Sequence, residues 1–394
     1  MERLVPPDAR DVITGAIRAT LGAVSYEPSL DDWQARPAAE LGMNADAVAA
    51  AIAYHRAHET RWRPDFLTAG GRYIGVADET PSAGDVLGPV RPRGGPNGMI
   101  VRGGSIVAEW GDTRRADMTF SVAKSYLAVL AGLAVARGLI RDLDDPVRRY
   151  AVDGGFDSAQ NRDVTWRHLL QQTSEWQGVV WGKPDTIDHN RDVGKSELGD
   201  ADKGQARPLR RPGTLWEYND VRVNRLSLAL LEVFRRPLSD VLRDEVMDPI
   251  GASTTWEWVP YDNAWMTIDG ARLPSVPGGS HWGGGLWMST RDHARFGLLV
   301  HRAGRWGGRE IVPGVWIAEM RRPCPINPEY GLLWWLNTGR RQLPSASESS
   351  YAARGAGSNV IWIDPDRDLV VVVRWIDKPH VAGFVERVVA ALAR

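Results

Sequence analysis

A nearly continuous run of apolar side chains lies at residues 121–136, and Lys124 is the single charged residue within it. A helix that is apolar on all sides is usually buried in a protein rather than lying on its surface. The sequence therefore predicts a buried helix that begins close to Ser121. A lysine one turn into such a helix is unusual, because lysine is rarely buried without a partner.

Shorter apolar stretches at both ends of the chain have the length and composition of β-strands. Two of the pairs are separated by residues typical of turns, one by Gly103-Gly104 and the other by residues 364–368. We expect strands at residues 99–102, 105–110, 330–336, 360–363 and 369–375.

Helices are predicted by polar capping residues followed by apolar positions at helical spacing. The region at residues 76–98 is rich in proline, glycine and serine, and an irregular connection is expected there. The expected helices, with candidate caps, are 44–59 (Asn44 or Asp46), 220–234 (Asn219 or Asp220), 290–303 (Ser289 or Thr290) and 382–392.

Strands near both ends with helices between them predict an α+β fold, in which helices flank an antiparallel sheet. Residues 96–140 and 300–394 are expected to form the sheet and its helices. Residues 141–299 are expected to form a mostly helical lobe inserted between them. Residues 1–95 are interpreted as a helical and irregular extension that packs on this core.

Composition narrows the possible partners and location of the protein. The chain has 394 residues with 48 basic and 49 acidic side chains, so its net charge of −1 does not favour binding to nucleic acid or to an anionic membrane. No apolar stretch approaches the length of about 18 residues that spans a membrane. The N-terminus lacks the pattern of a signal peptide, so we expect a soluble cytoplasmic protein.

Ser121 and Lys124 are the leading candidates for catalytic chemistry. Residues at positions i and i+3 share a helix face, so the lysine amine can reach the serine hydroxyl. Burial disfavours the charged ammonium, so we expect a lowered pKa for Lys124 and proton transfer from Ser121 to it. The alternative is a helix-capping serine followed by a solvated lysine. The apolar surroundings and the scarcity of lysine, five in the chain, disfavour it.

Two further segments carry residues that suit acyl chemistry. Tyr218 follows Pro212-Gly213 on a loop before a predicted helix, where a phenol near a lysine cation acts as a proton shuttle. Taken alone, it reads as an ordinary half-buried tyrosine. The small residues at 355–358 allow a substrate to approach the backbone, where an N–H group joins that of Ser121 in an oxyanion hole. A glycine-rich bulge is the alternative there.

These three elements, in this order and spacing, resemble the serine β-lactamase and penicillin-recognising superfamily. The resemblance covers about residues 97–385 and is closest to class C β-lactamases, family VIII esterases and 6-aminohexanoate-dimer hydrolase. It implies that Ser121 is the acylated nucleophile, that Lys124 is its base and that Tyr218 moves a proton to the leaving group. It also implies backbone oxyanion donors at Ser121 and Ser358, and a third motif at Gly355, Ala356 and Gly357.

The sequence departs from the family pattern in two places. Asp220 stands where the family usually has asparagine, and the third motif lacks its lysine or histidine. Arg354 lies one residue early and, on a strand, is expected to point to the opposite face. Efficient β-lactam hydrolysis is therefore not favoured. Additional candidates for contact with the substrate are Asp220, Trp176, His281 and Trp282.

Other kinds of site lack their motifs. The three glycines at 283–285 are not followed by Gly-Lys-Ser or Gly-Lys-Thr, so a phosphate loop is not predicted. Neither His-Glu-x-x-His nor a pair of cysteines occurs, so we expect no metal and no cofactor. The single cysteine, Cys324, lies between two prolines and is interpreted as structural.

The sequence thus predicts a serine-dependent hydrolase that cleaves an ester or amide bond of a small molecule. A transacylase that passes the acyl group to an amine or alcohol would use the same residues. A catalytically silent binding protein of the same fold is a third interpretation. The substrate and the oligomeric state are left open by the sequence.

Overall fold

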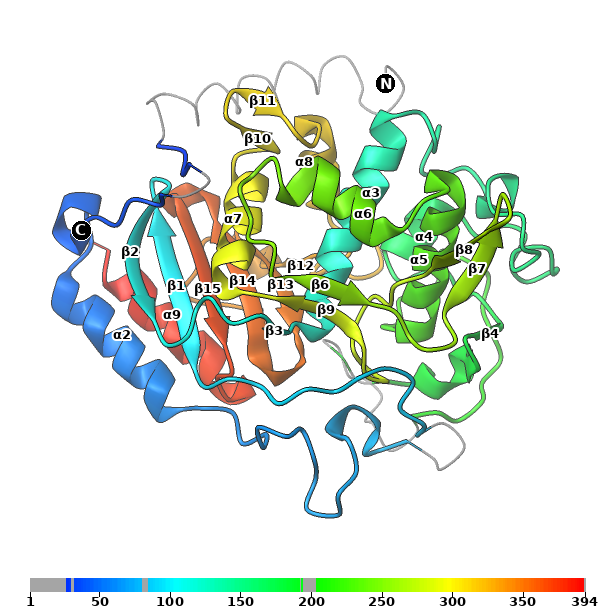
Figure 1. Cartoon of the computed structure of the whole chain (residues 1–394), viewed down its shortest axis with the longest axis horizontal. Coiled ribbons are helices and arrows are strands. Elements are labelled where there is room, and N and C mark those ends of the chain that lie inside the picture. Colours follow the sequence, from blue (N-terminus) through cyan, green and yellow to red (C-terminus); the bar gives the residue numbers. More distant parts are fainter. Residues whose placement is uncertain (1–25, 30–31, 80–83, 192, 194–202, 393–394) are drawn as a thin grey trace.

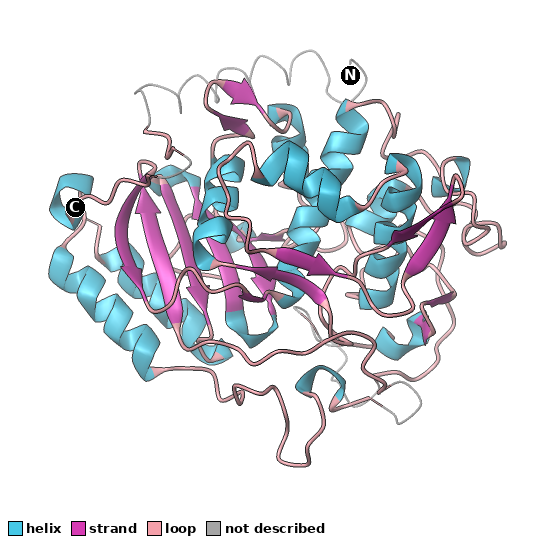
Figure 2. Ribbon diagram, in the orientation of Figure 1, coloured by secondary structure: helices cyan, strands magenta, loops and turns pink. Residues whose placement is uncertain are grey.

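A six-stranded antiparallel sheet, covered by helices, lies in one half of the protein, on the left in Figures 1 and 2. The computed structural model describes residues 26–29, 32–79, 84–191, 193 and 203–392. The strand order is β12-β13-β14-β15-β1-β2. The bounds are β1 Asn97–Arg102, β2 Ser105–Trp110, β12 Trp335–Leu336, β13 Tyr351–Gly355, β14 Asn359–Asp364 and β15 Leu369–Arg374.

The sheet joins the two ends of the chain, because β1 pairs with β15 in the register Ile100↔Val371. Every residue of β14 and β15 is buried, since helices cover both faces of the sheet. Helices α2 (Ala45–Ala57) and α9 (Val381–Ala390) pack on one face, and α7 (Thr290–His301) packs on the other (Figure 1). This arrangement confirms the predicted α+β fold.

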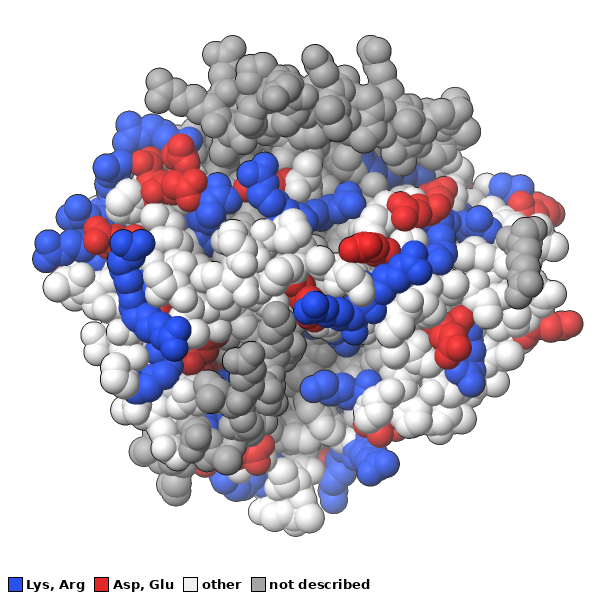
Figure 3. Space-filling view, turned by 180° about the vertical axis from the view of Figure 1, so that it is seen from behind, with Lys and Arg blue, Asp and Glu red and all other residues white. Residues whose placement is uncertain are grey.

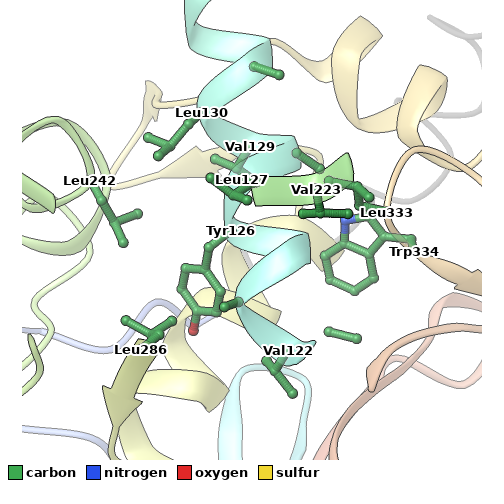
Figure 4. Close-up of a cluster of buried hydrophobic side chains, with 14 of the residues drawn as sticks. Val122, Tyr126, Leu127, Val129, Leu130, Val223, Leu242, Leu286, Leu333 and Trp334 are labelled. Atoms are coloured by element: carbon green, nitrogen blue, oxygen red, sulfur yellow. The ribbon is translucent and has the colours of Figure 1, made fainter. Parts of the chain in front are cut away.

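Helix α3 (Ala123–Ala136) is the buried helix that the sequence predicts, and every residue from Ala123 to Val135 is buried. The α-helix begins two residues later than Ser121, which lies in a preceding 3-10 turn, Phe120–Val122. Figure 4 shows the α3 side chains pointing in several directions, against segments distant in the sequence. Those neighbours include Val223, Leu242, Leu286, Leu333 and Trp334.

The remaining elements surround α3 and α7. The other helices are α4 Trp166–Leu170, α5 Asp220–Phe234, α6 Leu238–Leu242 and α8 Gly314–Met320. A three-stranded sheet has the order β3-β9-β6, with bounds Asp117–Met118, Gly285–Met288 and Glu257–Val259. Two-stranded pairs are β4 Val179–Val180 with β5 Lys183–Pro184, β7 Trp265–Ile268 with β8 Ala271–Pro274, and β10 Arg305–Trp306 with β11 Arg309–Glu310.

The local sequence signals place most helix starts correctly. The Asn44 side chain accepts a hydrogen bond from the N–H of Ala47 at the start of α2. Asn219, rather than Asp220, caps α5, and Ser289 caps α7. These side chains satisfy N–H groups that have no partner within the helix.

The strand predicted at residues 330–336 is wrong for most of its length. Only Trp335 and Leu336 pair with β13. Leu333 has a left-handed backbone (φ 57°), and the Gly331 N–H donates to the Trp334 carbonyl, so the chain turns there. The apolar character of the segment reflects burial in this turn rather than pairing in the sheet.

The described surface has mixed charge. On the face shown in Figure 3, basic and acidic side chains are interspersed with uncharged ones. Within the described residues, the helices are too short or too polar to cross a membrane. The division into three segments that the sequence suggests stays a prediction.

Arg374 at the end of β15 connects the large sheet to the three-stranded one. It is 1% exposed and donates to the Met288 carbonyl at 2.7 Å, to the Met118 carbonyl at 2.8 Å and to Asn359 Oδ1 at 2.7 Å. Burial lowers the pKa of Arg374 to about 10, and Asp117 partly offsets this effect. The side chain thus satisfies buried acceptors from three segments.

We predict that Arg374→Met lowers the free energy of unfolding by about 3–5 kcal/mol, because it leaves buried acceptors without donors. Urea denaturation followed by circular dichroism measures this change. Arg309→Met, at an exposed position on β11, is the control and is expected to change stability by less than about 0.5 kcal/mol. Equal effects of the two substitutions would contradict the role given to Arg374.

Candidate active site

The structure brings Ser121 and Lys124 into direct contact. Lys124 is 1% exposed, and its Nζ donates to Ser121 Oγ at 2.9 Å. The same amine donates to Asp220 Oδ1 at 2.5 Å and to the Gly278 carbonyl at 3.1 Å. The turn before α3 and the first turn of α3 therefore place the hydroxyl and the amine as the Ser-x-x-Lys spacing predicts.

The electrostatic state of Lys124 differs from the prediction. Burial is the largest single influence on the pKa of Lys124, and it lowers this pKa. The Asp220 carboxylate and the Tyr218 phenol together raise the pKa by more than burial lowers it, so the net shift is upward. The expectation of a lowered pKa is therefore wrong. The resting amine is an ammonium ion paired with Asp220, because a carboxylate in direct contact outweighs the cost of burial.

Asp220 is the centre of the charges around the site. Its Oδ2 accepts from Arg191 Nη1 at 2.7 Å and lies 3.1 Å from His281 Nδ1. Burial raises the pKa of Asp220, but Lys124, Arg191 and His281 outweigh burial and hold this pKa well below its usual range. Asp220 is 5% exposed and is not among the residues that line the cavity, and its side chain contacts Lys124 directly.

His281 and Trp282 form a layer behind Asp220. His281 Nε2 lies 2.9 Å from Glu79 Oε1, and Glu79 pairs with Lys203 at 2.5 Å. Burial lowers the pKa of His281, but the hydrogen bonds to Asp220 and Glu79 outweigh burial and raise it. Trp282 stacks on the imidazole with ring centroids 4.1 Å apart. Both side chains were predicted to contact the substrate, yet neither lines the cavity.

A cavity of about 470 Å³ opens at Ser121. One wall is aromatic, with Tyr218 stacked on Trp335 at a centroid distance of 5.8 Å. Lys124 Nζ lies 4.9 Å from the centre of the Tyr218 ring, so the predicted nucleophile, amine and phenol meet at one place. The described lining residues include Trp62, Ser121, Arg191, Tyr218, Trp335, Gln342, Arg354, Gly355, Ala356, Gly357, Ser358, Asp377 and Lys378.

Gly355 lies close against the backbone of Thr119 and Ser121. A Cβ atom added at Gly355 would lie 2.3 Å from the Thr119 carbonyl oxygen and 3.1 Å from the Ser121 nitrogen. The turn at Ala356–Ser358 then leads into β14, with left-handed backbones at Gly357 and Ser358. All four residues of the predicted third element line the cavity.

One prediction about an individual side chain needs correction, and a second side chain has an unexpected place. Trp176 is buried, and its Nε1 donates to the Gly155 carbonyl at 2.8 Å, so it does not line the cavity. Arg354 does line the cavity. Its neighbour in the strand, Gly355, lies against the backbone of Thr119 and Ser121. That the Arg354 side chain points to the opposite face of β13 stays a prediction.

Sequence reasoning missed several residues of the cavity. Arg191, Trp335, Gln342 and Lys378 come from loops and strand ends that no motif marks. Trp62, in the segment before β1, belongs to the region interpreted as an extension. A sequence without its fold contains no signal that brings these positions together, because each depends on tertiary packing.

One cluster has the residue types of a metal site. Ligand atoms of Glu79, Asp188 and His281 lie within 4.8 Å of one another. Lys203 pairs with Glu79, and Arg191 lies 3.3 Å from Asp188. These cations already neutralise the carboxylates, so the donor set is engaged by the protein and does not fit a divalent ion.

Comparison with known proteins identifies the family. The sequence model of the Beta-lactamase family matches residues 99–389. No curated protein sequence matches the chain significantly. Among solved structures, a penicillin-binding protein homolog from Caulobacter crescentus has a TM-score of 0.59 at 15% identity, over 89% of this chain and 99% of that one.

Two further structures share the fold. A Bacillus anthracis protein provisionally described as a 6-aminohexanoate-dimer hydrolase has a TM-score of 0.56 at 15% identity, covering 93% of this chain and 98% of that one. A family VIII carboxylesterase has a TM-score of 0.54 at 17% identity, covering 75% and 92%. The predicted resemblance is confirmed: the chain belongs to the Beta-lactamase family and has the fold of proteins that include hydrolases.

Proposed function

We propose that the protein hydrolyses an ester or amide bond of a small molecule through an acyl-enzyme on Ser121. The observation that carries this proposal is the 2.9 Å contact between Lys124 Nζ and Ser121 Oγ at the wall of a 470 Å³ cavity. Membership of the Beta-lactamase family and the hydrolases among proteins of this fold support it.

The proposed reaction has two halves. In acylation, Ser121 Oγ attacks the carbonyl carbon, its proton passes to neutral Lys124, and Tyr218 donates a proton to the leaving group. Water then attacks the acyl-enzyme and gives a proton to the Tyr218 phenolate, while Lys124 returns its proton to Ser121 Oγ as the acid leaves. Because Asp220 keeps most Lys124 side chains protonated, only the fraction that has lost its proton is competent as a base.

The position of β13 beside Ser121 suggests which backbone N–H groups stabilise the negative oxygen of the tetrahedral intermediate. The N–H of Ser121 is the first donor. The resemblance implies Ser358 as the second donor, and the backbone of Gly355 lies against Ser121. We therefore assign the second donor to Ala356, the next residue along the chain, which lies on the cavity wall.

We predict that Ser121→Ala abolishes hydrolysis of p-nitrophenyl butanoate and removes the adduct formed with a fluorophosphonate, as measured by mass spectrometry. Lys124→Ala should reduce the labelling rate by about 10²–10⁴-fold, because the base is lost. Ser125→Ala is the matched control and should still be labelled, since Ser125 Oγ donates to the Leu333 carbonyl instead. An adduct on another residue would refute the assignment, as would full activity of Lys124→Ala.

Product analysis with added amines separates hydrolysis from acyl transfer.

Asp220→Asn is predicted to move the pH dependence of fluorophosphonate labelling. Removing the carboxylate lowers the pKa of Lys124, so the neutral amine exists at lower pH. The rise of the labelling rate between about pH 6 and pH 10 should therefore shift toward lower pH. Asp188→Asn, which removes a contact to Arg191 rather than to Lys124, should shift it less. An unchanged profile in Asp220→Asn would show that Lys124 is not the titrating base.

Gly355→Ala tests the oxyanion geometry. The added Cβ would overlap the Thr119 carbonyl and displace the strand from the Ser121 N–H. We expect labelling to slow by about 10- to 100-fold, as for loss of alignment of one oxyanion donor. Gly95→Ala is the control, because a Cβ there meets open space. A normal rate in Gly355→Ala would exclude the proposed register.

A further inference from the structure

His281 lies between two buried carboxylates. Its Nδ1 is 3.1 Å from Asp220 Oδ2, and its Nε2 is 2.9 Å from Glu79 Oε1. All three side chains are buried. An ionised carboxylate only accepts hydrogen bonds, and a neutral imidazole has a single N–H group to donate. Both contacts are therefore hydrogen bonds only when the ring is an imidazolium, with a proton on each nitrogen.

Both carboxylates are ionised, and this fixes the charge of the ring between them. Burial raises the pKa of Glu79, but the contacts with His281 and Lys203 outweigh burial and lower it. Burial also raises the pKa of Asp220, and the cations around this carboxylate outweigh burial. Trp282 stacks on the imidazole with an angle of 4° between the ring planes, so it holds the ring in the plane of both contacts. A cation on the face of a tryptophan is itself attracted by that ring.

Charged groups from several segments surround the His281 ring. Burial lowers the pKa of His281, the two bonded carboxylates and Asp188 raise it, and Arg191 lowers it, with a net rise. Two nearby phenols are uncharged, because burial raises the pKa of each. The titratable groups around His281 and Trp282 in the described chain are Asp220 of α5, Glu79 and Tyr73 before β1, Asp188 and Arg191 before α5, Lys183 of β5, Lys203 and Tyr261.

Asp220 is shared by three cations. Lys124 donates to Oδ1, whereas Arg191 and His281 contact Oδ2. One negative charge thus serves three positive ones, and each positive charge opposes the others. Burial and Arg191 lower the pKa of Lys124, whereas Asp220 and Tyr218 raise it. An imidazolium on the same carboxylate oxygen acts in the same direction as Arg191, because both are cations close to the amine.

We propose that His281 is a positioning residue whose fixed positive charge limits how strongly Asp220 holds the proton of Lys124. It thereby sets the pH range in which Ser121 is activated, and Glu79 keeps the ring charged. This inference rests on the proposed function, since it concerns the base of the same reaction. His281 is not among the residues that line the cavity, so it acts through Asp220 and takes no direct part in bond cleavage.

Nitrogen NMR of the native protein tests the charge of the ring. Both nitrogens of an imidazolium carry a proton, and their chemical shifts differ from those of a neutral ring. The His281 signals are assigned through their proximity to the Trp282 ring. At about pH 7.5, one unit above the ordinary pKa of histidine, His281 should still be an imidazolium. Glu79→Gln should lower the pH at which the ring loses its proton. A neutral ring in the native protein at this pH would overturn the proposal.

Fluorophosphonate labelling tests the coupling to Lys124. His281→Gln removes the charge and keeps an amide N–H donor, so Lys124 should hold its proton more strongly. The labelling rate at about pH 8 should fall by about 3- to 30-fold, and its rise should lie at higher pH, opposite to the shift expected for Asp220→Asn. His301→Gln is the matched control, because His301 Nε2 lies 2.7 Å from Asp368 Oδ1 at the end of α7. An unchanged or faster rate in His281→Gln would overturn the proposal.

A second substitution distinguishes lost charge from damaged packing. His281→Gln leaves the negative charge of Glu79 with one cation fewer, and this charge also favours the protonated Lys124. Adding Glu79→Gln removes it and should recover about 3-fold or more of the lost labelling rate. Two packing defects would instead slow labelling further. Absence of recovery would overturn the proposal. Thermal melting identifies any variant that does not fold, and NMR of the native protein then decides the question.

A direct measurement of Lys124 separates this inference from the proposed function. Carbon NMR of the lysine side chains in Ser121→Ala follows the loss of the Lys124 proton, and His281→Gln should move it toward higher pH. That shift supports the charge coupling even if Ser121 of the native protein never reacts. If Ser121 is labelled but His281→Gln changes neither the labelling rate nor the Lys124 titration, the inference fails while the hydrolase assignment stands.

Discussion

The ion pair between Lys124 and Asp220 is the interaction on which the rest of the site depends. Both side chains are almost completely buried, and removing either charge from water is costly unless the other is present. Arg191 and His281 contact the same carboxylate, and Glu79 and Lys203 continue the alternation of charge. The buried charges are therefore stable as a group, and the position of each one is fixed by its neighbours.

This network changes what the lysine contributes at rest. The lysine is an ammonium ion that donates to Ser121 Oγ, so it orients the hydroxyl and provides a positive charge beside it. A negative charge developing at Ser121 or at Tyr218 is stabilised by that ammonium, and Arg191 lies 5.7 Å from the Tyr218 ring centre. In the proposed mechanism, reactivity as a base depends on the fraction of Lys124 that is neutral, and Asp220 controls that fraction.

The sequence could predict features that depend on local pattern. The buried helix after Ser121, the hairpin of β1 and β2 and the cap of α5 follow from apolar runs, glycines and capping side chains. Features that depend on tertiary distance could not be predicted in this way. The position of Asp220 was recognised, but its contact with Lys124 and the resulting pKa direction require the fold. The oxyanion register likewise depends on which glycine meets the Ser121 backbone, and a stretch with Gly355 and Gly357 offers more than one choice.

Lys124 and Arg354 differ in the partner that the protein provides for each cation. The protein provides Asp220 for Lys124, so the charge of the lysine is balanced before any substrate arrives, and its work concerns the proton of Ser121. Arg354 receives only the neutral oxygen of Gln342 from the described residues. The physical cost of burying charge therefore explains why the cation at Ser121 is paired within the protein before any substrate arrives.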